Sequence, residues 1–344
     1  MTVDLSSLAV QHDPYPLYAA MRRRPDIARV SHATLGKDSY FVTRYADVVA
    51  VLKDPRCIND VSKVPGRGDL TKKWYVPTLL KALLNSMALK DEPDHTRLRH
   101  LVHKAFTPAM IQQHSGNIEL IADELLDAAA SKEEIDFMAD FALPLPLNVI
   151  GEMMGVPPAD RPKFRRWMGN TLADSSTRGL VSMLPKLRNA FGLNGFLKNL
   201  VADRRRNPQA DLTTALVHAR ESGDSLSEAE LVSMLFLILF AGHETTVNLI
   251  GSGMLALLQN PDQFATLKAN PRLLDSAIEE LLRFTNPVQH IAIRYPLEDI
   301  ALDGATIPRH STVLLGIAAA NRDETVFDDP DGLDIARDPN RHIA

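Results

Sequence analysis

Four consecutive residues that follow an apolar stretch carry side chains that can do chemistry. Residues 241–246 read AGHETT, so a carboxylate and two hydroxyls follow two small residues. Thr245 lies four residues after Ala241, on the same face of a helix, and a threonine hydroxyl can bond the carbonyl one turn earlier. Small Ala241 and Gly242 would leave a groove, into which Glu244 could pass protons from solvent. The alternative is a kinked helix whose polar residues are only solvated.

One long helix is expected to position these residues. The run 231–241 is apolar apart from a single serine, and Ser227 with Glu230 has the spacing of a capping box. Asn260 and Pro261 supply a stop, so the helix should cover 231–260 with about nine turns. The apolar run is too short for a bilayer span of roughly 20 residues, which favours a buried core helix.

Three possible metal sites can be weighed from the residue types. His243 and Glu244 begin like the zinc pattern H-E-x-x-H, but Val247 stands where the second histidine should be, so zinc is rejected. The single cysteine, Cys57, excludes an internal disulfide and a cysteine-rich metal site, and a free thiol at the start of a loop is more often incidental than catalytic. An acidic group in the tail suggests magnesium, but the proline and glycine within it favour a solvated turn: Asp328, Asp329, Pro330, Asp331 and Gly332.

A cationic stripe runs along the helix expected over 91–106. His95, Arg99 and His103 follow one another at intervals of four residues, while the leucines between them point elsewhere. Guanidinium and imidazolium groups give charge-assisted hydrogen bonds, so the stripe could bind a carboxylate or a phosphate. The alternative is a solvated basic face.

Other charged residues have structural explanations. Glu280 and Arg283 are three apart on the helix expected over 272–285, and such a pair on a surface contributes little. The arginine runs 22–24 and 204–206 lie where helices are expected to end, and cations there suit the helix dipole.

Composition limits the class of protein. The 344 residues are 45% hydrophobic, enough for a large core, and no linker divides them, so we expect a single domain over 1–344. With 38 basic and 43 acidic residues the formal charge is −5, which argues against nucleic acid as the main partner. The N-terminus has no signal-peptide or anchor pattern, so we expect a cytoplasmic protein without membrane attachment.

The periodicity predicts a mainly α fold with a small β-sheet region. Helices are expected at 14–24, 45–53, 91–106, 109–131, 143–154, 160–174, 185–206, 210–221, 231–260 and 272–285. Strands are expected at 27–30, 40–42, 291–294, 300–302 and 313–316, and a loop at 56–68. The tail 321–344 is expected to be irregular.

Taken in order, four motifs resemble a bacterial soluble cytochrome P450, a haem-thiolate monooxygenase. They are HTRLR at 95–99, AGHETT at 241–246, E-x-x-R at 280–283 and the tail at 321–344. DPYPLYAAM near the start and the arginine of IAIRY fit as well, so the resemblance covers essentially the whole chain. AGHETT together with E-x-x-R in this order is highly specific, whereas either alone is weak.

The resemblance implies roles for the helix at 231–260. It would lie over the distal face of haem b, with Ala241 and Gly242 forming the oxygen groove. Thr245 would hydrogen-bond the bound dioxygen, Glu244 would be the acid of a proton relay, and Thr246 would assist the local hydrogen bonding.

The resemblance also implies a clamp and a network. His95, Arg99 and Arg294 would hold the haem propionates. Glu280, Arg283 and a tail arginine, for which we choose Arg337, would form a buried structural network. The loop 56–85 and the helices near 160–206 would shape the substrate pocket and its lid.

The sequence departs from the family pattern at its end. Ala344 precedes the loop that carries the cysteine ligand of the iron, and Cys57 lies in the wrong region to replace it. The axial ligand, the following helix and the last strands are therefore expected to be missing, leaving apolar surface bare. We expect a truncated gene product or fragment rather than a repurposed shortened protein, with weak or altered haem binding and no thiolate spectrum.

The implied function is insertion of one oxygen atom of dioxygen into a small organic substrate, with electrons from a ferredoxin-like partner. The rival from another class is a non-catalytic helical protein that binds a hydrophobic ligand or a partner. A nonfunctional remnant is the third possibility. Bound haem with turnover would exclude the binding protein, whereas a ligand-induced rise in melting temperature without haem would favour it.

Overall fold

The described strands fall in one part of the chain, whereas helices occur throughout it. The structure is a computed structural model that describes residues 2–5, 7–32, 36–74, 76, 78–172, 180–220 and 223–344. Its internal contacts define two compact units, a sheet unit (residues 1–68 and 248–344) and a helical unit (residues 69–247). The expectation of one domain over 1–344 stays a prediction.

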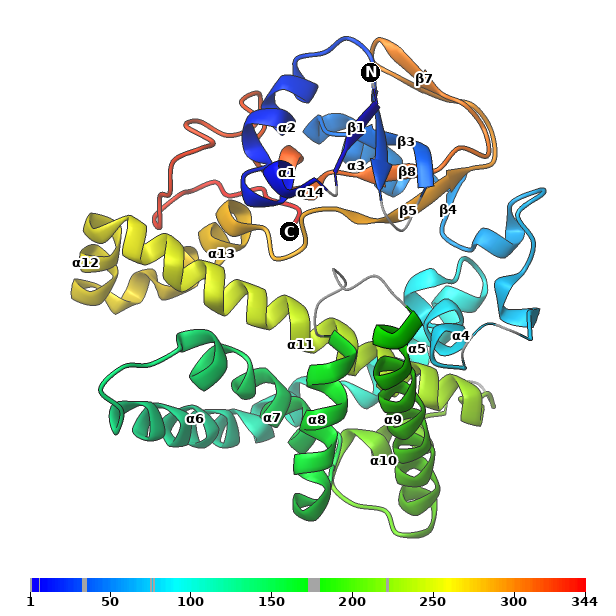
Figure 1. Ribbon diagram of the computed structural model, residues 1–344, viewed down its shortest axis with the longest axis vertical. Helices are drawn as coiled ribbons and strands as arrows, with labels where there is room; N and C mark the ends of the chain where they lie inside the picture. Colours follow the sequence, from blue (N-terminus) through cyan, green and yellow to red (C-terminus); the bar gives the residue numbers. More distant parts are fainter. Residues whose placement is uncertain are drawn as a thin grey trace. The chain divides into compact units, whose positions relative to one another are not determined.

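The sheet unit holds every strand of the described chain (Figure 1). The strands are β1 (Thr2–Asp4), β2 (Ala28–His32), β3 (Gly36–Val42), β4 (Cys57–Ile58), β5 (Ile291–Pro296), β6 (Ile300–Leu302), β7 (Ala305–Ile307) and β8 (Val313–Leu315). Their order in the sheet is β1-β2-β3-β8-β5-β4, and β6 and β7 form a separate antiparallel ribbon. The β1–β2 and β3–β8 pairs are parallel, and the other pairs of the sheet are antiparallel.

Strand β8 lies inside the sheet and is covered on both faces. Leu314 packs with Phe41 and Tyr18 in one hydrophobic cluster, whereas Val313 and Leu315 pack with Val42 in another. Because successive side chains of a strand point to opposite faces, a continuous apolar run such as VLL suits a strand buried on both sides.

Short helices surround the sheet in this unit. They are α1 (Leu8–His12), α2 (Tyr15–Arg22), α3 (Tyr45–Lys53), η1 (Val61–Lys63), α12 (Pro261–Ala269), η6 (Pro271–Leu273), α13 (Leu274–Thr285) and α14 (Ile317–Ala320). Arg22 ends α2 with a buried side chain that donates to Ala319 O at 2.9 Å and pairs with Glu324 at 3.1 Å. The prediction of a structural role for this arginine is thereby confirmed.

The helical unit has no strand among its described residues. Its elements are η2 (Leu70–Lys72), α4 (Thr78–Leu84), η3 (Met87–Leu89), α5 (Asp94–Ala105), α6 (Pro108–Ala130), the π-helix η4 (Met138–Ala142), α7 (Pro144–Met153), η5 (Pro158–Asp160), α8 (Arg161–Leu172), α9 (Leu180–Arg206) and α10 (Leu212–His218). The longest helix, α11 (Glu228–Gln259), begins in this unit and ends in the sheet unit.

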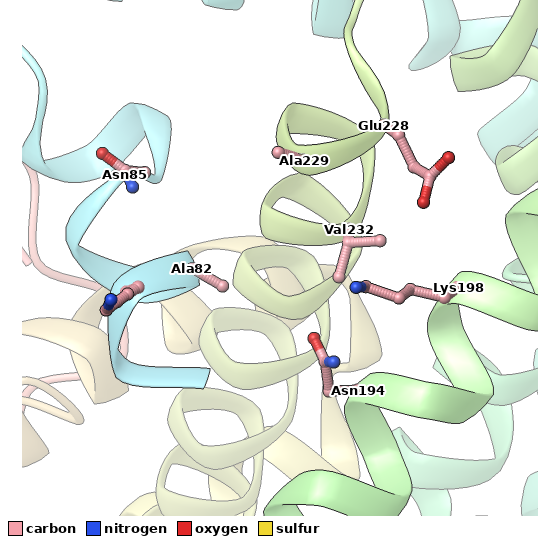
Figure 2. Close-up of a pocket in the computed structure, with 8 residues that line it drawn as sticks. Ala82, Asn85, Asn194, Lys198, Glu228, Ala229 and Val232 are labelled. Carbon is pink, nitrogen blue, oxygen red and sulfur yellow. The ribbon is translucent and has the colours of Figure 1, made fainter. Parts of the chain in front are cut away.

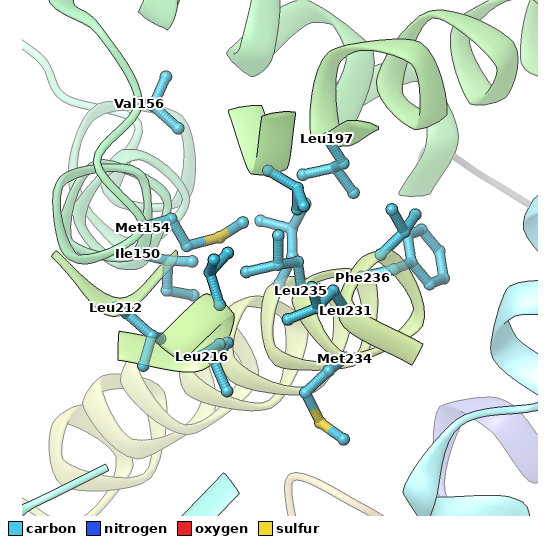
Figure 3. Packing of buried hydrophobic residues seen from close by; sticks show 14 of the residues in the cluster. Ile150, Met154, Val156, Leu197, Leu212, Leu216, Leu231, Met234, Leu235 and Phe236 are labelled. Atoms are coloured by element: carbon cyan, nitrogen blue, oxygen red, sulfur yellow. The ribbon is translucent and has the colours of Figure 1, made fainter. Parts of the chain in front are cut away.

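The first turns of α11 form one wall of the helical core (Figure 3). Leu231, Leu235 and Leu239 repeat every four residues and are almost completely buried, so they form one face of the helix. Opposite them lie Ile150 of α7 and Leu197 of α9. Burying one such leucine contributes about 1.5–3 kcal/mol, so this face holds α11 in place.

The capping box predicted for α11 is confirmed. Ser227 N donates to Glu230 Oε2 at 2.8 Å, and Glu230 N donates to Ser227 Oγ at 3.3 Å. Each group satisfies a backbone donor that the first helical turn leaves without a partner. The helix runs without interruption through residues 241–246.

The apolar run 231–241 is too short to span a membrane, but the whole helix α11 is long enough. Among the described residues, α11 is the one helix long and apolar enough to cross a membrane, with a mean hydropathy of 1.4 over its most apolar window. One such helix is weak evidence, because the core helix of a soluble protein passes the same test. The packing of its leucines supports the core helix.

Most predicted elements exist, with ends shifted by a few residues. The mainly helical class with a small sheet region is confirmed, and α3 and β6 match the prediction to the residue. The sequence missed α1, α4, α12, α14, β1, β4 and β7. The predicted helices at 160–174 and 210–221 extend into residues 173–179 and 221–222, which lie outside the described residues.

Candidate active site

Residues 241–246, which we call the AGHETT stretch, satisfy their two hydroxyls within the helix. Thr245 Oγ1 donates to Ala241 O at 2.6 Å, and Thr246 Oγ1 donates to Gly242 O at 2.8 Å. The local bond inferred from the spacing of Thr245 and Ala241 is therefore present. It leaves the lone pairs of each hydroxyl oxygen available to a further donor.

The side chains of this stretch divide between solvent and core. Ala241 and Glu244 are exposed and Thr245 is half-buried, whereas His243 and Val247 are buried. His243 and Val247 continue the four-residue repeat that packs against the helical core, so Ala241 and Glu244 necessarily point away from it. A carboxylate and a hydroxyl thus stay accessible at the middle of an apolar helix.

Gly242 has a packing function that the sequence did not show. A Cβ atom at this position would lie 3.2 Å from Cδ1 of Ile150 on α7, closer than ordinary van der Waals contact. The absence of a side chain lets the two helices approach. Of the two small residues expected to form a groove, Ala241 is the exposed one and Gly242 is half-buried.

His243 is a buried residue that the sequence considered only for zinc. Its Nε2 lies 3.3 Å from Leu143 O, and its Nδ1 is buried without a hydrogen-bond partner among the described residues. Burial lowers the pKa of His243, only partly offset by the bond to Leu143. The histidine is therefore held neutral, and the four-residue spacing to Leu239 could have shown that it faces the core.

The cationic stripe lies on α5. Leu98 and Leu101 are buried in the helical core and fix the rotation of the helix. His95 is half-buried with Nδ1 3.4 Å from Glu92 Oε1. Arg99 is exposed, and the described part of the chain gives it no hydrogen bond or ion pair. This guanidinium is therefore available to an anionic ligand.

Arg97, between these two residues, ties α5 to the start of α11. It pairs with Asp224 at 2.9 Å and with Glu230, the residue that also completes the capping box. The sequence analysis missed this contact, because nothing local links residues more than 120 positions apart. It fixes α5 against the helix that carries the AGHETT stretch.

The third residue of the predicted clamp belongs to the sheet unit. Arg294 lies on β5 opposite Val313 of β8 and is half-buried. The joint action of His95, Arg99 and Arg294 on one ligand stays a prediction.

The structure brings Glu280, Arg283 and Arg337 together in the sheet unit. Arg283 Nε and Nη2 donate to the two oxygens of Glu280 at 2.8 and 2.7 Å, and Arg337 Nε lies 3.2 and 3.1 Å from the same oxygens. Asp334 N and Asn340 Nδ2 add bonds of 3.0 and 3.1 Å. We call these five residues the Glu280 cluster.

The Glu280 cluster is a buried charge with every oxygen bonded. Glu280 and Arg283 are 0% exposed, so this is not the weak surface pair that E-x-x-R forms on most helices. Burial by itself would raise the pKa of Glu280, but the bonds from Arg283 and Asp334 N and the charges of both arginines hold that pKa below its ordinary value. Arg283 also donates to three carbonyls of the tail, those of Asn321, Pro330 and Gly332.

Cys57 does not have the properties of an iron ligand. It is buried on β4, where burial and nearby Asp54 raise the pKa of its thiol to about 11. A thiol with such a pKa stays protonated near neutral pH, whereas a metal ligand must be a thiolate. Among the described residues, no group of three or more His, Cys, Asp or Glu side chains could hold a metal ion.

The acidic group of the tail forms a turn. Asp329 has a φ of 43°, and Asp331 pairs with Arg322 at 3.0 Å. The carbonyl of Asp328 accepts from Arg337 at 2.7 Å. These contacts agree with the solvated turn preferred over a magnesium site.

Comparison with known proteins gives one consistent result. The family model described as Cytochrome P450 matches residues 45–337. The chain is 42% identical over 335 residues to the polyketide biosynthesis cytochrome P450 PksS of Bacillus subtilis (strain 168), covering 97% of this chain and 82% of that protein. It is 40% identical over 336 residues to the vitamin D(3) 25-hydroxylase of Pseudonocardia autotrophica, covering 97% and 80%.

Solved structures agree. The structure of the bacillaene polyketide synthase cytochrome P450 PksS matches this chain with a TM-score of 0.89 at 40% identity. The match covers 98% of this chain and 83% of the PksS chain. P450BioI, solved in complex with a hexadec-9Z-enoic acid ligated acyl carrier protein, gives a TM-score of 0.85 at 35% identity and covers 97% and 84%. The similarity confirms the predicted fold class, and the bacterial relatives support a soluble protein.

Proposed function

The chain belongs to the cytochrome P450 family, and on that premise we propose which of its residues carry the reaction. It is a haem-dependent monooxygenase, an oxidoreductase that acts on a small organic substrate with dioxygen and a redox partner. Nothing in the comparisons favours the non-catalytic binding protein that was the rival hypothesis.

Haem would supply the site that binds and activates dioxygen. The donors on α5 fit its propionates, because Arg99 is exposed with its guanidinium uncommitted and His95 lies one turn before it. We assign the propionate contacts to His95, Arg99 and Arg294. The one cysteine of the sequence, Cys57, does not fit the thiolate ligand, since its pKa is raised to about 11.

Glu244 and Thr245 are assigned to proton transfer. Glu244 is exposed, so it can exchange protons with solvent. Thr245 donates a hydrogen bond to Ala241 O at 2.6 Å and keeps lone pairs that can accept a hydrogen bond from water or from a bound molecule. We assign the delivery of a proton from solvent to Glu244 in its acid form, and the orientation of the water that carries this proton to the oxygen of Thr245.

The remaining residues of the stretch support these two. Ala241 leaves open space beside Thr245, Gly242 lets α11 approach α7, and Thr246 bonds its own helix. The Glu280 cluster is assigned a structural role, because its carboxylate is 0% exposed and bonded at both oxygens. We also propose a ferredoxin-type electron donor and a cytoplasmic location.

The observation that carries the assignment is the exposed carboxylate and the half-buried hydroxyl on a helix whose opposite face packs in the core, and threonine variants test it. Thr246→Ala is a matched control for Thr245→Ala, because each hydroxyl bonds the carbonyl four residues earlier. Product formed per NADH consumed, with a ferredoxin and its reductase, should fall roughly 100-fold for Thr245→Ala and little for Thr246→Ala.

Thr245→Ser, which keeps the hydroxyl, should retain most of the product yield. Equal losses in the two alanine variants would contradict the role of Thr245. Replacing the ferredoxin by a flavodoxin tests the donor separately, because support of turnover by the flavodoxin alone would contradict a ferredoxin-type partner and leave the threonine result unchanged.

A further inference from the structure

A cavity lies within the helical unit, at the first turns of α11 (Figure 2). Its volume is about 320 Å³, at the lower end of the range for small-molecule sites. Three helical segments, far apart in the sequence, form its wall. The lining residues are Lys81, Ala82 and Asn85 in and after α4, Asn194 and Lys198 on α9, and Glu228, Ala229 and Val232 on α11.

The cavity carries a surplus of positive charge. Lys81 and Lys198 line it from two different helices, and neither has a hydrogen bond or ion pair within the described residues. Glu228, the one acidic residue of the wall, lies 3.5 Å from Arg205 Nη1, so its charge is already matched. Two ammonium groups are therefore left to attract an anion.

The rest of the wall selects for a ligand with an apolar body. Ala82, Ala229 and Val232 are apolar, and the amides of Asn85 and Asn194 can donate further hydrogen bonds. At the start of α11 the capping box already bonds Ser227 N and Glu230 N. The anion would be held by side chains.

The cavity lies on a different side of α11 from the exposed Ala241 and the half-buried Thr245. Val232 precedes Ala241 by nine residues, which is two and a half turns of 3.6 residues, so the two side chains point in opposite directions. Along the axis they are about 14 Å apart. A ligand at Val232 would therefore not compete with a molecule beside Thr245.

The cavity is next to a contact that ties α4 to α11. Ser233 Oγ donates to Ala82 O, the carbonyl beside Lys81. A ligand bonded to Lys81 and Lys198 would connect α4 to α9 as well and would restrain α4 from a second direction.

We propose that this cavity binds a small organic monocarboxylate. The carboxylate would lie between Lys81 and Lys198, and the apolar body would pack on Ala82, Ala229 and Val232. The bound acid stabilises the position of α4 without entering the space beside Thr245, so it acts as an effector ligand rather than as a substrate.

Binding of octanoate to the full chain, measured by calorimetry and by the shift in melting temperature, tests the proposal. Octanoate should bind with one site and raise the melting temperature, and 1 M salt should weaken it. Lys81→Gln/Lys198→Gln should lower the affinity by about tenfold or more, because two charge-assisted hydrogen bonds are lost. Lys53→Gln/Lys73→Gln, which removes the same charge from exposed positions outside the cavity, should leave the affinity unchanged.

Three results would overturn the proposal. Octanoate affinity unchanged in Lys81→Gln/Lys198→Gln would place the acid elsewhere, including the space beside Thr245. Octanol binding as tightly as octanoate would remove the need for the lysines, and inorganic phosphate binding as tightly would remove the need for the apolar wall.

A measurement on the unaltered chain complements the variants. Lys81 and Lys198 should be protected by octanoate from acylation by an amine-reactive reagent, read by mass spectrometry, whereas Lys53 should react equally with and without it. Protection of Lys53 to the same extent, or no protection of Lys81 and Lys198, would contradict the site.

Discussion

The Glu280 cluster and the AGHETT stretch both place polar groups on helices with a buried face, but they satisfy them in opposite ways. Glu280 is bonded by donors from its own helix and from the tail, and solvent reaches neither oxygen. Thr245 bonds only to its own helix, and Glu244 faces solvent. A fully bonded carboxylate is fixed in position, whereas an exposed one beside a hydroxyl can change partners. The comparison separates a structural carboxylate from one suited to proton transfer.

The largest expected effect comes from breaking the Glu280 cluster. Arg283→Met leaves the buried carboxylate of Glu280 without its strongest partner, so the free energy of unfolding should fall by about 3–5 kcal/mol. Urea unfolding measures it. Glu280→Leu/Arg283→Met/Arg337→Met removes all three paired charges of the cluster and should lose less than the single variant. Equal losses would mean that packing, and not the uncompensated charge, holds this region.

The next effect concerns the cationic stripe on α5, whose charges should contribute to haem binding and not to the stability of the fold. Arg99→Gln should weaken haem binding by roughly tenfold, because a charge-assisted bond to a propionate is lost, while unfolding stays within about 0.5 kcal/mol of the parent. Haem titration of the apoprotein measures the affinity. His100→Gln, an exposed neighbour outside the stripe, is the control, and an equal loss there would argue against a specific contact.

A smaller effect is expected from pH at His243, the buried polar residue of the AGHETT stretch. Burial lowers its pKa in the folded state, so below the ordinary value of about 6.5 the unfolded chain binds more protons. Stability should therefore fall as pH drops through 6.5 towards the lowered pKa. His243→Gln should lose that part of the pH dependence in urea unfolding between pH 5 and 8. An unchanged difference between the two proteins across this range would show that His243 does not titrate on unfolding.

The smallest effect is expected on stability at the two threonines. Thr245→Ala and Thr246→Ala each remove one hydroxyl bond to the local backbone and gain helix propensity, so each should change the free energy of unfolding by less than about 1 kcal/mol. Thermal unfolding measures both. A large loss for Thr245→Ala alone would assign that hydroxyl to the fold and weaken the contrast with the Glu280 cluster.

Local patterns in the sequence determined much of this protein. The helix α11 and its polar stretch could be predicted, because their signals lie within one or two helical turns. These signals are the four-residue repeat of leucines, the spacing of Ser227 and Glu230, and the sequence AGHETT. The same holds for α5 and its cationic stripe. The motif order also identified the family before any comparison was made.

Contacts between distant segments were decided only by the tertiary structure. Strands β1 and β4 are three and two residues long and become visible through pairing with β2 and β5, which no local pattern reveals. Other features also depend on contacts between distant elements. They are the burial of Glu280, the ion pairs of Arg97 and the packing of Gly242 against Ile150.

The cavity with Lys81 and Lys198 is the clearest case. The two lysines are separated by more than 100 residues and lie on helices whose amphipathic patterns give no sign of a shared ligand. Helical periodicity is determined by residues close together in the sequence, because backbone hydrogen bonds of a helix join residues four positions apart. Which helix faces which depends on burial of apolar surface over the whole unit, and that is known only once the chain has folded.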